Sequence, residues 1–249
     1  MFPRKDDTVS AFIFFICIAL IASILQTSTG FGFSIMATPL FLMLFHPQEA
    51  IQINIILSLV ISLALIRSIM DSVDFALLKR LIAASLAGVP FGIAIYMSIN
   101  IEAFKFSVGV LLLMLTLLLI LNFRISQTRG RDNLAGGLSG LFTTSIGMPG
   151  PPILLYFTGT SMDKDRVRAT TLAFYLFIYS VSLVTQIIFS GTSVLIWKSS
   201  LYAAPAVLAG LVIGQYVHKW IDQDTFRIFT YVLLSGTGVY LLIQSLLSL

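Results

Sequence analysis

Hydroxyl side chains precede two interruptions in an otherwise apolar sequence. In the first half of the chain, Gln26–Thr29 leads directly into Gly30-Phe31-Gly32, and in the second half Thr143–Ser145 leads into Gly147–Pro152. Glycine supplies unusual backbone dihedrals and proline removes a backbone donor, so a continuous helix through either stretch is not expected. Hydroxyls and helix N-termini are groups that bind anions. The two stretches therefore predict one anion site built by both halves of the chain.

The residues beyond each break belong to the same prediction. Peptide groups left unpaired in lipid are costly, so broken backbone at membrane depth must be shielded by protein or face a watery cavity. Such breaks mark substrate sites in transporters, where the ends of half-helices point at the substrate. Ser34 and Pro152 are expected to begin two short arms whose N-terminal N–H groups face a site near the membrane midplane. Proline suits a first helical turn because its missing donor would be unused there.

Polar residues in the helix after each break complete the predicted site. Asn54 and Ser58 are four residues apart and share one helix face. Thr171 and Tyr175 stand at comparable places in the second half, and Arg168 either draws anions in or extends to the membrane surface. The predicted substrate-binding residues are Thr27, Ser28, Thr29, Gly30, Gly32, Ser34, Asn54, Ser58, Thr143, Thr144, Ser145, Gly147, Met148, Pro149, Gly150, Pro151, Pro152, Arg168, Thr171 and Tyr175.

Other roles compete with anion transport. Each hydroxyl could instead bond a carbonyl of its own helix, and an anion channel would use the same groups. Gly137-Leu138-Ser139-Gly140 also matches the GxSG of intramembrane serine hydrolases, which need a histidine base, and His218 is the one later histidine. Asp and Glu fall in the tail, loops and helix ends, so no carboxylate proton relay is expected within the spans. Transport is then either uncoupled or coupled through protonation of the substrate.

The composition indicates a polytopic membrane protein. Of the 249 residues, 57% are hydrophobic and 10% charged, against about 25% charged in soluble domains. Ile101–Phe123 and Phe226–Leu249 exceed the roughly 18 apolar residues of a membrane span. The net charge of +4 comes mostly from basic residues in short loops, which indicates membrane topology rather than nucleic-acid binding. Cys17 is the only cysteine, and His46 is far from His218, so no disulfide, metal site or cofactor is predicted.

The hydrophobic pattern predicts an all-α protein with two similar halves. LAGVPFG at Leu86–Gly92 matches LAGLVIG at Leu208–Gly214, and an acid, a phenylalanine and a base follow each at the same offset. The Gly-x-x-x-Gly in both lets neighbouring helices approach closely. The predicted units are a first transmembrane repeat (Met1–Phe123), a basic linker (Arg124–Asp132) and a second repeat (Asn133–Leu249). The expected helical segments are Val9–Gln26, Ser34–Phe45, Glu49–Ile66, Leu81–Ile99, Ile101–Phe123, Asn133–Gly147, Pro151–Thr160, Arg168–Phe189, Trp197–His218 and Phe226–Leu249.

The length of the second broken segment predicts the orientation of the halves. Asn133–Thr160 is too short to cross twice, because each arm of about 14 residues rises only about 21 Å against a hydrocarbon core of about 30 Å. A re-entrant hairpin followed by three spanning helices would give the halves opposite orientations, as inverted repeats. Arg67–Arg80, Arg124–Asp132, Ser161–Arg168 and Lys219–Arg227 then share one side, and they hold three, three, three and two Lys or Arg, eleven of the fifteen. That side is predicted to be cytoplasmic, in the inner cell membrane. A parallel arrangement, with one broken helix crossing per half, is the alternative.

Two motifs and the overall layout point to a family. They are the Gly30-Phe31-Gly32 break with a later proline, the GxxSGxxxxxxGMPGPP pattern of Gly136–Pro152, and the short duplicated organisation. In these features, which cover essentially the whole chain, the sequence resembles the TauE/SafE sulfite-exporter family of bacterial membrane transporters. The resemblance implies export of sulfite, organosulfonates such as sulfoacetate, or related sulfur-containing anions. The expected partners are a small anion and the lipid bilayer, with no nucleic acid; the oligomeric state stays open, a homodimer included.

Overall fold

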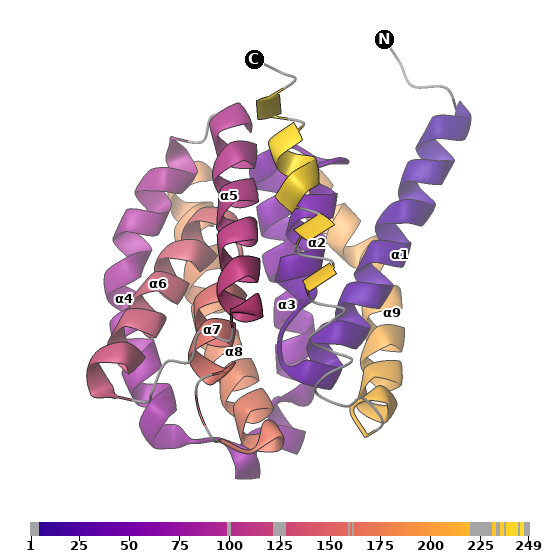
Figure 1. Cartoon of the computed structure of the whole chain (residues 1–249). Helices are drawn as coiled ribbons and strands as arrows, with labels where there is room; N and C mark the ends of the chain where they lie inside the picture. The colour runs from indigo at the N-terminus through magenta and orange to yellow at the C-terminus, as the bar shows by residue number, and fades with distance from the viewer. Residues whose placement is uncertain are drawn as a thin grey trace.

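The regular elements of the described chain are helices (Figure 1). The computed structural model describes residues 5–98, 101–121, 128–158, 160, 162–219, 231–232, 235–236, 238–243 and 245–246. The elements are α1 (Lys5–Thr29), α2 (Phe33–Phe41), α3 (Pro47–Ile69), the 3₁₀ turn η1 (Met70–Ser72), α4 (Phe75–Met97), α5 (Ile101–Ile120), α6 (Arg129–Ile146), α7 (Gly150–Thr158), α8 (Lys164–Ser190) and α9 (Val194–Val217). Five of them, α1, α3, α4, α8 and α9, are long and apolar enough to cross a membrane. The predicted all-α membrane fold is confirmed.

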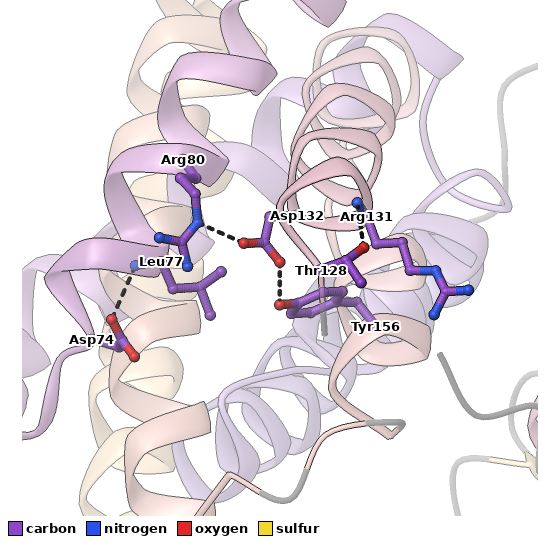
Figure 2. Close-up of polar contacts among 7 residues, drawn as sticks. All are labelled: Asp74, Leu77, Arg80, Thr128, Arg131, Asp132 and Tyr156. Carbon is purple, nitrogen blue, oxygen red and sulfur yellow. Dashed lines mark hydrogen bonds and ion pairs between the residues drawn. The ribbon is translucent and has the colours of Figure 1, made fainter. Parts of the chain in front are cut away.

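Polar capping residues begin several helices ahead of their apolar runs. Asp74 accepts a hydrogen bond from the first turn of α4, and Thr128 accepts one from the first turn of α6 (Figure 2). Such caps satisfy N–H groups that the helix itself leaves unpaired. Hydropathy alone predicts later starts, at Leu81 and Asn133, because Lys79 and Arg80 interrupt the apolar run of α4 and the first turn of α6 is polar. As a result Asp132, predicted to lie in the linker, stands in the first turn of α6.

The most buried spans are α3 and α8, which lie at the centre of the bundle. Figure 1 shows α1 and α9 to one side of them and α4 and α6 to the other. The outer helices expose large apolar side chains such as Phe91 on α4 and Leu201 on α9. An outer surface rich in apolar side chains matches the expectation for a protein surrounded by lipid.

Two pairs of helices approach each other closely through glycines. A Cβ atom at Gly88 of α4 would lie 2.1 Å from the Gly137 carbonyl oxygen of α6, and one at Gly210 of α9 would lie 2.7 Å from the Leu20 carbonyl oxygen of α1. No side chain fits at such distances. The predicted close approach through the Gly-x-x-x-Gly segments is confirmed, with α6 as the neighbour of α4 and α1 as the neighbour of α9.

Polar contacts define two ends of the bundle. At what we call the charged end, Arg80 of α4 contacts Asp132 of α6, and Asp74 at the start of α4 contacts Arg166 and Thr170 of α8. At the opposite end, which we call the neutral end because these contacts between helices join uncharged groups, Gln52 of α3 donates hydrogen bonds to the Tyr96 hydroxyl of α4 and to the Gly191 carbonyl between α8 and α9. α4 and α8 therefore start at the charged end, whereas α3 and α9 start at the neutral end.

Each broken segment folds back as a hairpin. The Tyr156 hydroxyl of α7 donates to Asp132 in the first turn of α6, so α7 returns to the charged end from which α6 began. In the first half, the ring of Phe41 at the end of α2 lies 5.1 Å from that of Phe15 on α1, so α2 runs back along α1. The backbone turns at left-handed glycines, Gly30 and Gly32 in the first hairpin and Gly147 in the second.

Candidate functional site

The break of the second hairpin is closed by its own backbone and by one side chain of the first half. Gly147 adopts φ of 71°, and the amides of Gly147 and Met148 donate to the carbonyls of Thr143 and Phe142, as in the glycine-dependent ending of many helices. Asn54 of α3 donates its side-chain N–H to the Gly147 carbonyl at 2.7 Å. The break is thus fixed by a residue of the other half of the chain.

The first break has the reciprocal arrangement. Gly30 adopts φ of 84° and its amide donates to the Gln26 carbonyl. The Nε atom of Arg168, on α8 in the second half, donates to the Thr27 carbonyl at 2.7 Å. A cation at a helix C-terminus satisfies carbonyls that lack an intrahelical partner and interacts favourably with the helix dipole. Arg168 therefore fastens the end of α1.

The two breaks share a short motif that the sequence comparison above missed. Thr27-Ser28-Thr29-Gly30 corresponds to Thr144-Ser145-Ile146-Gly147, and in both the last residue is the left-handed glycine. The carbonyl of the first residue in each motif accepts a hydrogen bond from a side chain of α8. The Thr27 carbonyl accepts from Arg168, and the Thr144 carbonyl accepts from Gln186. Aligning the halves on the glycine of each break would have revealed the motif.

The breaks lie at different depths rather than together at the midplane. The first contacts α8 at Arg168, whereas the second hairpin contacts α8 at Ser182, whose hydroxyl lies 2.8 Å from that of Thr144. Fourteen residues of helix correspond to about 21 Å. The hairpins overlap because their first arms, 25 residues in α1 and 18 in α6, exceed half of the membrane thickness. Beyond the breaks the first turns of α2 and α7 nevertheless meet, because a Cβ at Gly150 would be 3.0 Å from the Ile35 side chain.

Buried polar atoms without hydrogen-bond partners line the facing sides of α3 and α8. Such atoms are rare in folded proteins because leaving one unpaired costs about 1–3 kcal/mol. They recur at four-residue spacing on both helices, so each set shares one helix face. Within the described chain the unpartnered side-chain atoms of this region are Gln26 Oε1, Thr27 Oγ1, Asn54 Oδ1, Ser58 Oγ, Ser62 Oγ, Thr171 Oγ1, Tyr175 Oη, Tyr179 Oη and Gln186 Oε1.

Two tyrosines bring this polar face to the hairpins. The Tyr175 hydroxyl lies 3.2 Å from the position of a Cβ at Gly150, at the start of α7. The Tyr179 hydroxyl is directed at Ser34 and Ser58, but neither its oxygen nor that of Ser58 completes a hydrogen bond of ordinary geometry. The two rings are 5.3 Å apart. Tyr179 was not predicted from the sequence, although its spacing of four residues from Tyr175 was a usable signal.

The two short arms differ in the donors that their first turns offer. Phe33, Ser34 and Ile35 begin α2, and no carbonyl in the described chain accepts a hydrogen bond from their amides. In α7 the corresponding places hold Pro151 and Pro152, which have no N–H. The first turn of α2 therefore offers three amide donors, whereas α7 offers only that of Gly150 before Ile153.

Several predicted hydroxyls bond backbone groups close to them in sequence. Thr143 donates to the Ser139 carbonyl, Ser145 to that of Leu141, and Ser28 to that of Leu25. The Thr29 hydroxyl contacts the Leu25 carbonyl and the backbone of Phe31 in the first break. These contacts satisfy the side chains locally. The predicted residues that the structure brings to one polar region are instead Asn54, Ser58, Thr171 and Tyr175, together with the breaks and the start of α2.

Ser139 and His218 are not brought together. The Ser139 hydroxyl donates to the Pro149 carbonyl at 3.1 Å and so supports the turn of the second hairpin. His218 contacts the Ser28 carbonyl and Asp165. A serine nucleophile needs its base within hydrogen-bond reach, so this pair does not form a hydrolase site.

A buried carboxylate at the charged end was not anticipated from the sequence. The Asp132 side chain is 1% exposed, and Figure 2 shows it between Arg80 and Tyr156. Arg80 Nε lies 2.6 Å from one carboxylate oxygen, and the Tyr156 hydroxyl donates to the other at 2.5 Å. Asp132 thus connects α4 with both arms of the second hairpin at its base. Among the described residues no cluster of His, Cys, Asp and Glu suitable for a metal ion is found.

A family model described as Sulfite exporter TauE/SafE matches residues 15–241 of the chain. The match spans both hairpins and the helices between them. No curated protein and no solved structure matches the chain.

Proposed function

Because the chain belongs to the sulfite exporter TauE/SafE family, we propose that it carries sulfite or a related small sulfur-containing anion across the cell membrane. The anion binds between the start of α2 and the break of the second hairpin. The observation that supports this site is the meeting of three unpartnered hydroxyls, on Ser58, Tyr175 and Tyr179, with the free N–H groups of the first turn of α2.

The donors of this site suit a small oxyanion. Hydrogen bonds to a charged group contribute about 1.5–3 kcal/mol each, and several are needed to offset the loss of water around a buried charge. Hydroxyl and amide groups can supply them to the oxygens of sulfite or of a sulfonate group. The unpartnered side chains of this part of the described structure are neutral. A site of neutral donors favours a singly charged anion, such as hydrogen sulfite or an organosulfonate, over a dianion.

We also propose that the two halves are inverted repeats. In support, α4 lies against α6 and α9 against α1, so the second spanning helix of each half packs on the hairpin of the other. The base of the second hairpin lies at the charged end, whereas α2 of the first hairpin leads into α3, which starts at the neutral end. Hairpins entering from opposite ends provide two access routes to one central site, as alternating access requires. On this proposal the charged end is cytoplasmic.

Sulfite efflux from proteoliposomes tests the function. Gly150→Val would place a branched side chain against Ile35 and the Tyr175 hydroxyl. We therefore expect the affinity for sulfite, and with it the efflux rate, to fall by about tenfold or more. Gly130→Val is the matched control, because a side chain there meets no atom within 4 Å. Saturable efflux supports a carrier, and efflux that rises without saturation supports a channel. Equal efflux from Gly150→Val and wild type would contradict the proposed site.

A further inference from the structure

We propose that His218 and Asp165 form a proton-binding site that fastens the tip of the first hairpin at the charged end. The Nδ1 atom of His218 lies 2.5 Å from the Ser28 carbonyl oxygen in the last turn of α1. Its Nε2 atom lies 2.8 Å from Oδ1 of Asp165 on α8. One imidazole ring therefore connects α9, α8 and the end of α1.

The partners of the ring determine how many protons the contact holds. A backbone carbonyl and a carboxylate accept hydrogen bonds and cannot donate them. Both ring nitrogens must therefore donate, which a neutral imidazole cannot do because only one of its nitrogens carries hydrogen. The arrangement holds one proton more than a neutral histidine beside a carboxylate. That proton can leave to solvent from either ring nitrogen. If Nε2 loses it, two hydrogen-bond acceptors face each other at Asp165; if Nδ1 loses it, the hydrogen bond to the Ser28 carbonyl is lost. In both cases the contact that holds the end of α1 is weakened.

The contact lies where it can control the hairpin tip. Ser28 precedes Gly30 by two residues, and its carbonyl is among those at the end of α1 that have no intrahelical partner. The neighbouring Thr27 carbonyl is held by Arg168, whose charge is fixed under ordinary conditions. Of the two residue types that fasten this helix end, arginine keeps its charge, whereas histidine is the type of side chain that binds and releases protons near neutral pH.

His218 has charged neighbours on α8 and on its own side of the contact. α8 contributes Asp165 at 2.8 Å and, one turn further, Arg168. The last turn of α1 contributes Gln26, Thr27, Ser28 and Thr29, which do not titrate in this range. On its own side, His218 is followed by the exposed Lys219. Among the described residues, Asp165 is the acid in ion-pair contact with His218.

The link to transport rests on the proposed function. Proton binding at His218 holds the tip of the first hairpin against α8 and α9, and proton release frees it at the charged end. The transported anion would then reach its site from that end in the deprotonated state. Such a site would couple a proton to transport without a carboxylate inside the spans.

Thermal unfolding of the purified, anion-free protein between pH 6 and 8 tests the proton site without reference to any substrate. We expect the Tm of wild type to be higher at pH 6 than at pH 8 by about 2–4 °C, the shift that one contact of ordinary strength gives in a chain of this size. His218→Gln should remove this pH dependence. Asp165→Asn, at a side chain that is 57% exposed, should remove it too, because an amide N–H can donate to a neutral ring. His46→Gln, the only other histidine, should keep the wild-type pH dependence.

A wild-type Tm that is flat across this range, or a slope retained in either His218→Gln or Asp165→Asn, would overturn the proton site. Failure of anion binding would leave these Tm values untouched, so the two proposals are tested separately. If the site is correct, His218→Gln should also remove the pH dependence of efflux of an organosulfonate, an anion whose own charge does not change between pH 6 and 8.

Discussion

The side chains that define the candidate site are ones that the fold does not use for its own stability. Ser58, Tyr175 and Tyr179 are buried, yet their hydroxyls have no hydrogen-bond partner in the described structure. Alanine in place of Ser58, or phenylalanine in place of either tyrosine, would remove the free-energy cost of a buried unpaired hydroxyl and would fill nearly the same volume. Hydroxyls kept at a cost in stability are better explained by a ligand, or by water that a ligand displaces, than by packing.

Two tyrosines with opposite surroundings provide a test at this scale. Tyr179→Phe removes an unpartnered hydroxyl and should raise the free energy of unfolding by about 1 kcal/mol. Tyr96→Phe removes a hydroxyl that contacts Gln52 and the Gln48 carbonyl, and should lower it by about the same amount. Thermal unfolding without anion measures both. Destabilisation of equal size in the two variants would show that the Tyr179 hydroxyl is satisfied in the folded protein.

At the scale of elements, the helices depend on glycines at particular contacts rather than on glycine content. Gly137 and Gly140 lie three residues apart on α6, but a Cβ at Gly140 would be 2.1 Å from the Ser85 carbonyl, whereas one at Gly137 would be 3.6 Å from its nearest neighbour. The first distance forbids a side chain and the second is ordinary contact. Close packing of α4 on α6 therefore depends on Gly140.

The same substitution at the two glycines should have opposite effects. Gly140→Ala must push α4 and α6 apart and should cost about 1–3 kcal/mol, as overpacking does. Gly137→Ala gains helix propensity and should stabilise by up to about 1 kcal/mol. Their Tm values in detergent, compared with wild type, measure the difference. A Tm for Gly140→Ala at or above the wild-type value would refute the close contact.

Much of the element plan could be predicted from sequence, and the shortfall has physical causes. Glycine and proline located both breaks, and hydropathy located α3, α4, α8 and α9, because membrane helices are selected for apolar length. The expected last span, Phe226–Leu249, lies largely outside the described residues. Hydropathy missed the buried Asp132, since a carboxylate in a polar first turn looks like a loop residue until Arg80 and Tyr156 approach it. It grouped all hydroxyls near the breaks together, whereas the direction of each depends on helix phase: Thr143 bonds its own helix and Thr144 faces Ser182.

At the scale of the whole molecule, the hairpins interlock across the halves. Arg168 of the second half fastens the first break, and Asn54 of the first half fastens the second. Each break is therefore held by a side chain that its own half does not contain. The proposed central site would therefore require both halves, as we expect of inverted repeats that act on one substrate.

The orientation of the molecule can be read from the outside of cells. In a Cys17→Ser background, a cysteine in place of Thr192, at the neutral end, should react with an impermeant thiol reagent applied outside. One in place of Gly130, exposed in the first turn of α6 at the charged end, should react only after the membrane is opened. Reversed labelling would place the charged end outside, and labelling of both from outside would contradict the assignment of the two ends to opposite faces.

The affinity for hydrogen sulfite, measured by calorimetry on the purified protein, tests the central claim most directly. Ser58→Ala and Tyr175→Phe remove one unpartnered hydroxyl each, from α3 in the first half and α8 in the second. Each should weaken binding by about ten- to a hundredfold, the effect of losing a hydrogen bond to a charged ligand, with one anion bound per chain. Tyr96→Phe, at the neutral end, should bind as wild type does. Unchanged affinity in both Ser58→Ala and Tyr175→Phe, with the proteins still folded, would contradict a shared site between the hairpins.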